Sequence, residues 1–465
     1  MLKLWQKTTY TWTIFRVKIY HQPMVKLLGF LLLFCLQRGN AALPSFASAV
    51  FSMYAIDSSS GQVLIDEHSE LSLIPASCIK IVTTATALLL LTPDAQFQTQ
   101  LEYDGIINQQ GTLEGNLYIR GGGDPCLGSS RVPPSLGWKE QLLLWAQAVH
   151  ERGIRSIAGR IIGDATLWEE SLVLPGWAYE DVGNYYGIGA SALTFHENLY
   201  SLTFEPGTAQ GDKTNILRTE PPLSRLQFLN EVTTGAKGSG DRACIYGSEF
   251  SYKKRVSGTV PSGVEEFHIK GAMPNPAESC ASLLKTVLTQ RGIPVLDKEY
   301  TEVEPRTPFH TTYSPPIKEI ISWTNKRSVN LYAEHLLKEL GSGSTAAGIY
   351  VIKDFWKKAG VNLKGFHMED GSGLSRQNCL TTKQLVEILL YVKKSPRFPI
   401  FLHSLPTVCG CKAKSGAMAL IRGYAGFKGN VIFAVLVNQN LDPDIKRKLE
   451  DVLIDLPQQA SPPSQ

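Results

Sequence analysis

Residues 75–91 read PASCIKIVTTATALLLL, a stretch that is apolar on nearly every face of a helix. Proline is favoured in the first turn of a helix, and Thr92-Pro93 would end one, so the sequence predicts a helix over these residues. A helix that is apolar all round is buried. The polar residues Ser77 and Lys80 near its start therefore need a reason to lie there.

Ser77 and Lys80 have the spacing that places two side chains on one face of a helix. A serine hydroxyl is a weak nucleophile and needs a neighbouring base. A lysine can serve as that base when burial or nearby cations lower its pKa. On this pattern alone a second interpretation stands, in which Ser77 is a helix N-cap and Lys80 a solvated residue of the first turn.

Two further motifs follow along the chain. Ser328-Val329-Asn330 comes just before a predicted helix over residues 330–340, and Lys414-Ser415-Gly416 comes ahead of a β run near the C-terminus. Taken singly, the first motif also fits an N-cap serine and the second a surface turn. Together and in this order, Ser-x-x-Lys, Ser-x-Asn and Lys-Ser/Thr-Gly form the signature of penicillin-recognising serine acyltransferases.

The long separation between Ser77 and Ser328 exceeds what an ordinary β-lactamase or a simple carboxypeptidase core has there. The chain therefore resembles the class C low-molecular-mass penicillin-binding proteins, of the D-Ala-D-Ala carboxypeptidase/endopeptidase type. The resemblance covers residues 45 to 455, and the following stretches support it: 74–77, 121–125, 330–334, 370–376 and 423–426.

The resemblance implies roles for the three motifs. Ser77 would attack the substrate carbonyl, and Lys80 would take the serine proton. Ser328 would relay a proton to the leaving amine, and Asn330 would position the substrate amide and Lys80. Lys414 would keep Lys80 neutral and attract the substrate carboxylate.

The same resemblance implies that Ser415 hydrogen-bonds the substrate carboxylate and that Gly416 and Ala417 line the binding strand. The backbone N–H groups of Ser77 and Ala417 would form the oxyanion hole. Two positions depart from the family pattern. Ala417 lacks the hydroxyl that the family often has there, which would weaken carboxylate binding, and Val329 replaces a common aspartate that is not a catalytic group.

The resembling family also has a pocket for the substrate side chain. Here Asp181 would pair with a substrate ammonium and Arg376 would face a carboxylate, as in diaminopimelate. Tyr186 and Met418 would pack against the aliphatic stem. The alternative interpretation is that Asp181 and Arg376 are ordinary solvated surface charges.

The predicted elements indicate an α/β, multi-domain chain: a penicillin-binding-protein/β-lactamase-like transpeptidase domain with a large, mostly β insert. A hairpin over Val50–Ile56 and Gln62–Asp66 and a C-terminal β run over 430–438 suggest one domain split by that insert. We expect a leader over 1–42, catalytic parts over 43–97 and 316–457, an insert over 98–315 of two subdomains with 124–190 nested within it, and a disordered tail over 458–465.

Composition limits the other function classes. The 465 residues carry a net charge of +4, which argues against nucleic acid as a partner because phosphate neutralisation needs a strong basic excess. The nine histidines include no HExxH or paired spacing, so we expect no metal, and the family mechanism needs no cofactor. Eight cysteines at scattered positions indicate no disulfide framework.

Residues 26–42 predict a signal peptide. Lys26 precedes ten apolar residues, and Gly39-Asn40-Ala41 supplies small residues for cleavage. Ten apolar residues are too few to span a bilayer, where about 20 are needed, so we expect export to the periplasm or cell envelope and at most peripheral membrane association. Met24 is an alternative start.

The sequence thus predicts a serine D-Ala-D-Ala carboxypeptidase/endopeptidase that acts on peptidoglycan stem peptides and cross-links and is inhibited by β-lactams. Two alternatives stay open: a β-lactamase, and a non-catalytic peptidoglycan-binding or sensor protein on the same fold.

Overall fold

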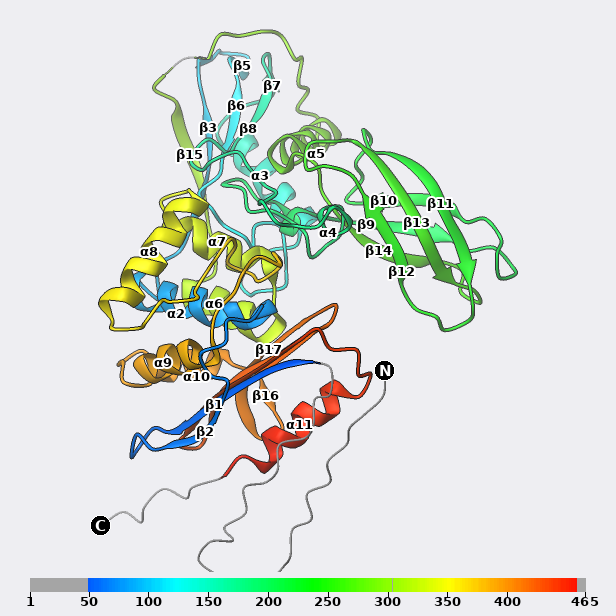
Figure 1. Cartoon of the computed structure of the whole chain (residues 1–465). Helices are drawn as coiled ribbons and strands as arrows, with labels where there is room; N and C mark the ends of the chain where they lie inside the picture. Colours follow the sequence, from blue (N-terminus) through cyan, green and yellow to red (C-terminus); the bar gives the residue numbers. More distant parts are fainter. Residues whose placement is uncertain (1–48, 303, 458–465) are drawn as a thin grey trace, which may run out of the picture. The chain divides into compact units, whose positions relative to one another are not determined.

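A six-stranded antiparallel sheet joins the two ends of the described chain (Figure 1). The computed structural model describes residues 49–302 and 304–457, all within the second of two units, Phe46–Gln465. The predicted signal peptide and the predicted tail lie outside the described residues. The strand order is β16-β17-β18-β19-β1-β2. The bounds are β1 Val50–Asp57, β2 Val63–Glu67, β16 Thr407–Val408, β17 Cys411–Met418, β18 Ile421–Lys428 and β19 Val431–Asn438.

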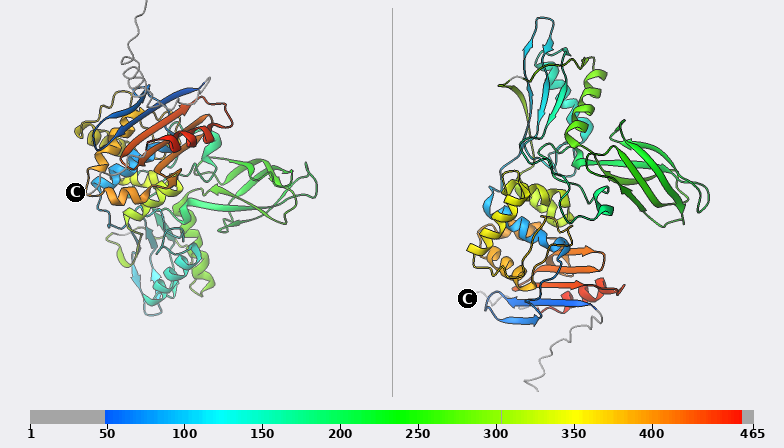
Figure 2. Two further views of the ribbon diagram at one scale, coloured as in Figure 1. Left: turned by 90° about the horizontal axis from the view of Figure 1, so that it is seen from below. Right: turned by 45° about the horizontal axis from the view of Figure 1, so that its top comes forward.

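Strand β19 lies at the centre of this sheet and is buried along its whole length. It pairs with β1 from Val50↔Asn438 to Asp57↔Val431, which places the first described strand beside the last (Figure 2, blue beside red). An uninterrupted apolar run such as residues 431–437 is typical of a strand covered on both faces. Helix α9 (Thr382–Lys393) packs against β19 and β1, and α11 (Ile445–Asp455) contacts β18 (Figure 1).

The helical layer surrounds α2 (Lys80–Leu90), whose residues 80–88 are all buried. The prediction of a buried helix here is confirmed, although its first turn, η1 (Ala76–Ile79), is a 3₁₀ turn. Helix α2 packs against four other helices of the layer. The layer contains α6 Ile317–Arg327, α7 Asn330–Leu340, α8 Thr345–Lys358, α9 Thr382–Lys393 and α10 Phe398–Ser404.

Between these parts the chain forms four smaller sheets and two long helices. The sheet orders are β15-β3-β6-β8, β4-β5-β7, β10-β9-β14 and β11-β13-β12. The helices α3 (Trp138–Glu151) and α5 (Pro276–Gln290) pack together beside the first of these sheets, and Trp145 and Leu284 are fully buried in the hydrophobic cluster of this region. The division of this region into two subdomains, with 124–190 nested in it, stays a prediction.

The bounds of these strands are β3 Gln98–Tyr103, β4 Ile106–Ile107, β5 Thr112–Glu114, β6 Leu117–Arg120, β7 Ser156–Ile157, β8 Ile161–Asp164, β9 Leu199–Glu205, β10 Asn215–Glu220, β11 Gln227–Gly235, β12 Arg242–Tyr246, β13 Lys253–Pro261, β14 Phe267–Ala272 and β15 Thr307–Tyr313. The helices are α3 Trp138–Glu151, α4 Tyr179–Val182, α5 Pro276–Gln290 and a 3₁₀ turn, η2, His196–Asn198.

Two sequence-based expectations need correction. The sequence of residues 157–163 indicates one β run, but β7 and β8 belong to different sheets. Gly159 between them lies against the Gly115 backbone, where a Cβ would come within 2.3 Å of a carbonyl oxygen. Lys414-Ser415-Gly416 lies inside β17, where the sequence suggested a turn ahead of the β run. Within the described ranges, no helix is long and apolar enough to cross a membrane.

Candidate active site

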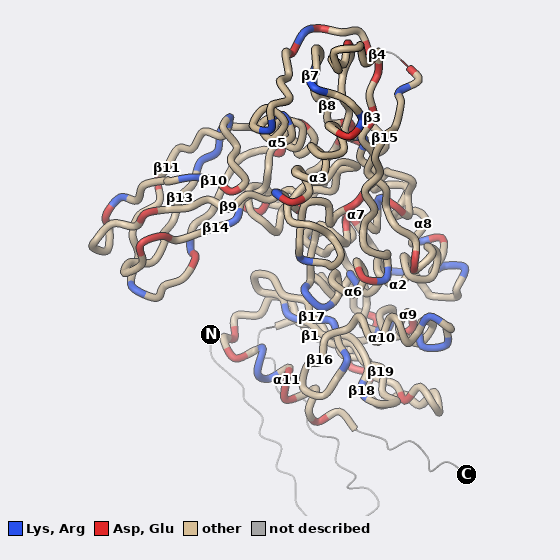
Figure 3. Tube along the Cα trace, turned by 180° about the vertical axis from the view of Figure 1, so that it is seen from behind, with Lys and Arg blue, Asp and Glu red and all other residues tan. Residues whose placement is uncertain are grey.

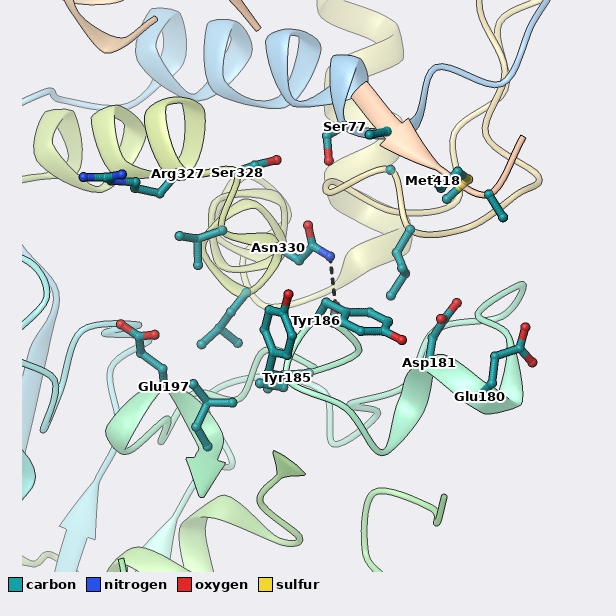
Figure 4. Close-up of a pocket in the computed structure, with 18 of the residues that line it drawn as sticks. Ser77, Glu180, Asp181, Tyr185, Tyr186, Glu197, Arg327, Ser328, Asn330 and Met418 are labelled. Atoms are coloured by element: carbon teal, nitrogen blue, oxygen red, sulfur yellow. Dashed lines mark hydrogen bonds between the residues drawn. The ribbon is translucent and has the colours of Figure 1, made fainter. Parts of the chain in front are cut away.

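The turn η1 presents Ser77 at the wall of a cavity of about 630 Å³ (Figure 4). Its neighbour Ala76 has a φ of 45°, an unusual conformation for a residue with a side chain. Strand β17 passes directly against this turn at Gly416, where a Cβ would lie 2.4 Å from the carbonyl oxygen of Pro75. Glycine is therefore required at 416, and the third motif is held against the first by close backbone packing.

Lys80 is fully buried behind Ser77. Its Nζ lies 2.9 Å from Ser77 Oγ, and it donates hydrogen bonds to Asn330 Oδ1 (2.7 Å) and to the carbonyl oxygen of Ser372 (2.5 Å). Burial, followed by the charge of Lys414, lowers the pKa of Lys80 well below its usual value. A neutral amine at this distance from a hydroxyl can accept its proton.

Lys414 is the second buried amine of the site. Its Nζ donates to Ser328 Oγ at 3.0 Å and to the carbonyl oxygen of Ser415 at 2.6 Å. Burial lowers its pKa to about 8, with the neighbouring Cys78 opposing the shift. Ser328 itself ends α6 in a left-handed conformation (φ 56°), which turns the chain into α7.

Asn330 begins α7 and joins the two sides of the cavity. Its Oδ1 accepts from Lys80, and its Nδ2 donates to the carbonyl oxygen of Tyr186 at 2.9 Å, as Figure 4 shows. Ala417 and Met418 reach the cavity from the end of β17, opposite Arg422 and Ile421 of β18. The structure thus brings together residues of all three motifs, namely Ser77, Lys80, Ser328, Asn330 and Lys414. Ser415 and Gly416 are not among the residues that line the cavity.

Two buried carboxylates behind Lys80 were not identified from the sequence. Glu334 accepts the backbone N–H groups of Gly371 (3.0 Å) and Ser372 (2.8 Å), and burial together with the charge of Asp370 raises its pKa to about 7. Together they fix the loop whose Ser372 carbonyl contacts Lys80. Asp370 accepts four hydrogen bonds, from Gly373 N, Ser375 N, Trp177 Nε1 and Asn378 Nδ2. The available signal was the spacing of Asn330 and Glu334, which share a face of α7.

The predicted side-chain pocket lies at one end of the same cavity, which Asp181, Tyr186, Arg376 and Met418 all line. Asp181 Oδ2 lies 3.5 Å from Arg376 Nη1, and the side chain of Asp181 is only 10% exposed while that of Arg376 is 42% exposed. Burial raises the pKa of Asp181, Arg376 opposes the shift, and the Tyr186 side chain hydrogen-bonds this carboxylate. A substrate ammonium and carboxylate would here replace an existing ion pair.

Among the described residues, no group of three His, Cys, Asp or Glu side chains could hold a metal ion. The seven cysteines that the structure describes are all free.

The sequence of this chain is similar to those of known carboxypeptidases. The profile of the D-Ala-D-Ala carboxypeptidase 3 (S13) family matches residues 37–432. A D-alanyl-D-alanine carboxypeptidase of an Actinomadura species is 25% identical over 86% of this chain and 80% of its own length. The D-alanyl-D-alanine carboxypeptidase DacB of Haemophilus influenzae is 23% identical over 83% of this chain and 85% of its own.

The fold is also that of a solved relative. The crystal structure of penicillin-binding protein 4 from Haemophilus influenzae superposes with a TM-score of 0.74, at 20% identity, over 89% of this chain and 96% of that one. A second structure of that protein, complexed with a β-lactam, gives a TM-score of 0.69. The mixed α/β fold expected from the sequence is therefore confirmed. Since the family profile spans most of the sequence, this chain belongs to the D-Ala-D-Ala carboxypeptidase 3 (S13) family, the low-molecular-mass penicillin-binding proteins.

Proposed function

We propose that this protein is a serine D-Ala-D-Ala carboxypeptidase/endopeptidase that forms its acyl-enzyme on Ser77. The observation that carries the proposal is the buried Lys80 Nζ, which lies 2.9 Å from Ser77 Oγ with a strongly lowered pKa. Membership of a D-Ala-D-Ala carboxypeptidase family supplies the substrate class.

In the acylation step, Ser77 Oγ attacks the carbonyl carbon of the penultimate D-Ala while Lys80 takes the hydroxyl proton. The new ester bond forms as the peptide C–N bond breaks. Ser328 passes a proton to the departing amine, and the 3.0 Å contact from Lys414 holds its hydroxyl in place. The backbone N–H groups of Ser77 and Ala417 would bind the oxyanion, where one such donor is typically worth about 10²–10³ in rate.

In the deacylation step, water attacks the ester and releases the acyl peptide. Lys80 accepts a proton from the water and returns it to Ser77 Oγ. A β-lactam ring presents the same carbonyl to Ser77 but leaves its amine tethered, so we expect a long-lived acyl-enzyme. The structure of the Haemophilus penicillin-binding protein 4 in complex with a β-lactam supports this expectation. A β-lactamase would instead release the opened ring quickly.

The substrate side chain would enter the end of the cavity that holds Asp181 and Arg376. A side chain ending in an amine and a carboxylate, as in diaminopimelate, would exchange the internal ion pair for one contact to each partner. Tyr186 and Met418, which line the same end, would pack against its aliphatic stem.

The substrate also sets the compartment and the partners. Peptidoglycan lies outside the cytoplasmic membrane, so the chain would be exported by its signal peptide to the periplasm or cell envelope. Its partners would be stem peptides and β-lactams and no nucleic acid. Figure 3 shows Lys and Arg interspersed with Asp and Glu along the described chain, which supports the last point.

Release of D-Ala from a diacyl-D-Ala-D-Ala peptide tests the proposal. Wild-type protein should release one D-Ala per peptide, and Ser77→Ala protein of unchanged circular dichroism should release none. Equal activity in the two proteins would refute the assignment of Ser77 as the nucleophile. An inactive but well-folded wild-type protein would favour the non-catalytic alternative.

A further inference from the structure

The cavity has a second end that the side-chain pocket does not use. In Figure 4, Arg327 and Glu197 lie on the side of Asn330 away from Met418 and Asp181. Arg131 also lines the cavity, together with a group of apolar side chains. These apolar residues are Ile188, Leu199, Val329 and Leu331. We name the set of these seven residues, Arg131, Ile188, Glu197, Leu199, Arg327, Val329 and Leu331, the leaving-group arm.

A buried ion pair is built into this arm. Glu197 Oε1 accepts hydrogen bonds from Arg131 Nε (2.6 Å), Ser129 Oγ (2.8 Å) and Tyr332 Oη (2.8 Å), and the glutamate side chain is only 5% exposed. The Arg131 side chain is 34% exposed, and within the described chain its two Nη nitrogens make no hydrogen bond. A guanidinium fixed through Nε with its Nη groups free is suited to bidentate binding of a carboxylate.

The backbone that carries Glu197 is strained. His196, Glu197 and Asn198 have consecutive φ values of 50°, 55° and 52°, a left-handed turn without glycine. Such conformations persist only where the surrounding structure enforces them, and they cluster at ligand-binding sites. The enforcing contacts are present, because Phe195 N donates to Asn198 Oδ1 and His196 N donates to the carbonyl oxygen of Leu127.

Arg327 is the second cation of the arm, and it lies beside Ser328, which would protonate the leaving amine. Arg327 is exposed and directly precedes Ser328. It lies over the ring of Trp323, with its Cζ 5.8 Å from the ring centroid. Whatever is attached to the leaving amine must continue past Ser328, and Arg327 lies on that side.

The charges at the two ends of the cavity differ in sign. Glu180, Asp181 and Arg376 give the side-chain end an acidic excess, whereas Arg131 and Arg327 outnumber Glu197 at the other end. A free D-Ala leaving group is too small to reach beyond Ser328. A cross-linked substrate leaves as a whole peptide strand that carries carboxylates, and such a strand matches a cationic arm with apolar walls.

We propose that the leaving-group arm binds the carboxylate-bearing peptide strand that departs when a cross-link is cleaved, with Arg131 and Arg327 as its anion contacts. This inference rests on the proposed function and extends it, because it assigns the endopeptidase substrate its own binding surface. The arm would set the preference for cross-linked over uncross-linked peptides.

Three substrates test the inference with the full chain. The first is a diaminopimelyl-D-Ala-D-Ala monomer. The second is a dimer joined by a D-Ala-to-diaminopimelate bond. The third is the same dimer with the carboxylates of its departing strand converted to carboxamides, except the one next to the scissile bond, which Lys414 and Ser415 would bind. The measured quantity is kcat/KM for each dimer divided by kcat/KM for the monomer.

Arg327→Glu should lower this ratio about tenfold for the carboxylate dimer, because the reversal replaces an attraction by a repulsion. Arg131→Lys, which keeps the charge beside Glu197 but lacks the two Nη nitrogens, should lower it as well. The matched control is Lys326→Glu, which makes the same charge change at the neighbouring exposed position outside the cavity and should leave the ratio unchanged. The carboxamide dimer should be a poorer substrate for wild-type protein and should respond little to Arg327→Glu.

An unchanged ratio in Arg327→Glu and Arg131→Lys, or an equal fall in Arg327→Glu and Lys326→Glu, would overturn the inference. So would wild-type protein that cleaves the monomer and never the dimer. Failure of the proposed function looks different, because wild-type protein would then neither release D-Ala from the monomer nor become labelled by penicillin.

Discussion

Glu334 accepts a 2.8 Å hydrogen bond from the backbone N–H of Ser372, whose own carbonyl oxygen accepts a hydrogen bond from Lys80. The carboxylate on α7 thus holds the loop that supports the catalytic amine, although it does not touch the cavity. Its second oxygen accepts from the N–H of Gly371. Replacement of this side chain would therefore change the position of Lys80 without removing any reacting group.

Glu334→Gln should lower kcat for D-Ala release and change KM little, because the glutamine NH₂ group cannot accept the hydrogen bond from one of the two backbone N–H groups. We expect a fall on the order of tenfold to a hundredfold, the usual cost of misplacing a catalytic group. Glu339→Gln, on the same helix but away from the active-site cavity, is the control and should keep its kcat. A rise in KM alone would show that Glu334 shapes substrate binding.

The raised pKa of Glu334 makes the free energy of unfolding depend on pH. Burial raises the pKa of Glu334 to about 7, so between about pH 4.5 and 7 the folded protein holds a proton that the unfolded chain has lost. The contribution of Glu334 to the free energy of unfolding therefore falls as pH rises through this window. Urea unfolding at pH 5 and pH 7 should show a larger fall for wild-type protein than for Glu334→Gln. An identical pH dependence would contradict this assignment.

Lys80→Arg should abolish acylation while leaving the fold intact. Arginine keeps the positive charge but has a pKa above about 12, so it cannot accept the proton of Ser77. Labelling with a fluorescent penicillin measures acylation, and circular dichroism checks the fold. Lys326→Arg, at an exposed position of α6, serves as the control. Near-normal labelling of the folded Lys80→Arg protein would show that Lys80 is not the base.

Lys414 should set the basic limb of the activity profile. Its pKa is lowered to about 8 by burial, and the proposed mechanism needs it charged. Activity should therefore decline as pH rises through about 8, and Lys414→Arg should move this decline to higher pH because arginine keeps its proton. The measurement is kcat/KM against pH for both proteins. A basic limb at the same pH in Lys414→Arg would assign the limb to another group.

Asp181→Ala should reduce the preference for a substrate side chain that carries an ammonium group. A desolvated charge pair that loses one partner typically costs about 2–5 kcal/mol in binding. The ratio of kcat/KM for a diaminopimelyl-D-Ala-D-Ala peptide to that for a minimal diacyl-D-Ala-D-Ala peptide should fall sharply. Equal losses on both peptides would show that Asp181 supports the fold.

The mature protein should start near Ala42. Mass spectrometry of protein from the envelope fraction tests this directly, because a cleaved leader removes residues 26–41. Protein that still carries residues 26–36 would indicate an anchor at the N-terminus.

The sequence predicted the parts of the site that are local in the chain. The helix over 330–340 has the predicted bounds, because the residues that pack it into the core and those that end it are all close together in the sequence. The short motifs named Ser77, Lys80, Ser328, Asn330 and Lys414, and the structure brings these residues together.

The missing parts depend on contacts between distant segments. Glu334 and Asp370 accept hydrogen bonds from backbone N–H groups of a loop. The spacing of Asn330 and Glu334 places both on one helix face, but nothing in the sequence indicates which backbone groups Glu334 would meet. Helix α10 was missed because its seven residues are too few for an apolar repeat to indicate a helix. The sequence of the Lys414 motif suggests a turn, because the contact that makes it part of strand β17, between Gly416 and the distant Pro75, cannot be read from the sequence.

Identification of the acylated residue decides whether Ser77 is the nucleophile. Wild-type and Ser77→Ala protein would be incubated with a fluorescent penicillin, digested, and mapped by mass spectrometry. We predict one stable adduct on the peptide that contains Ser77, and no adduct in Ser77→Ala protein of the same fold. An adduct on another residue, or labelling of Ser77→Ala protein, would contradict it.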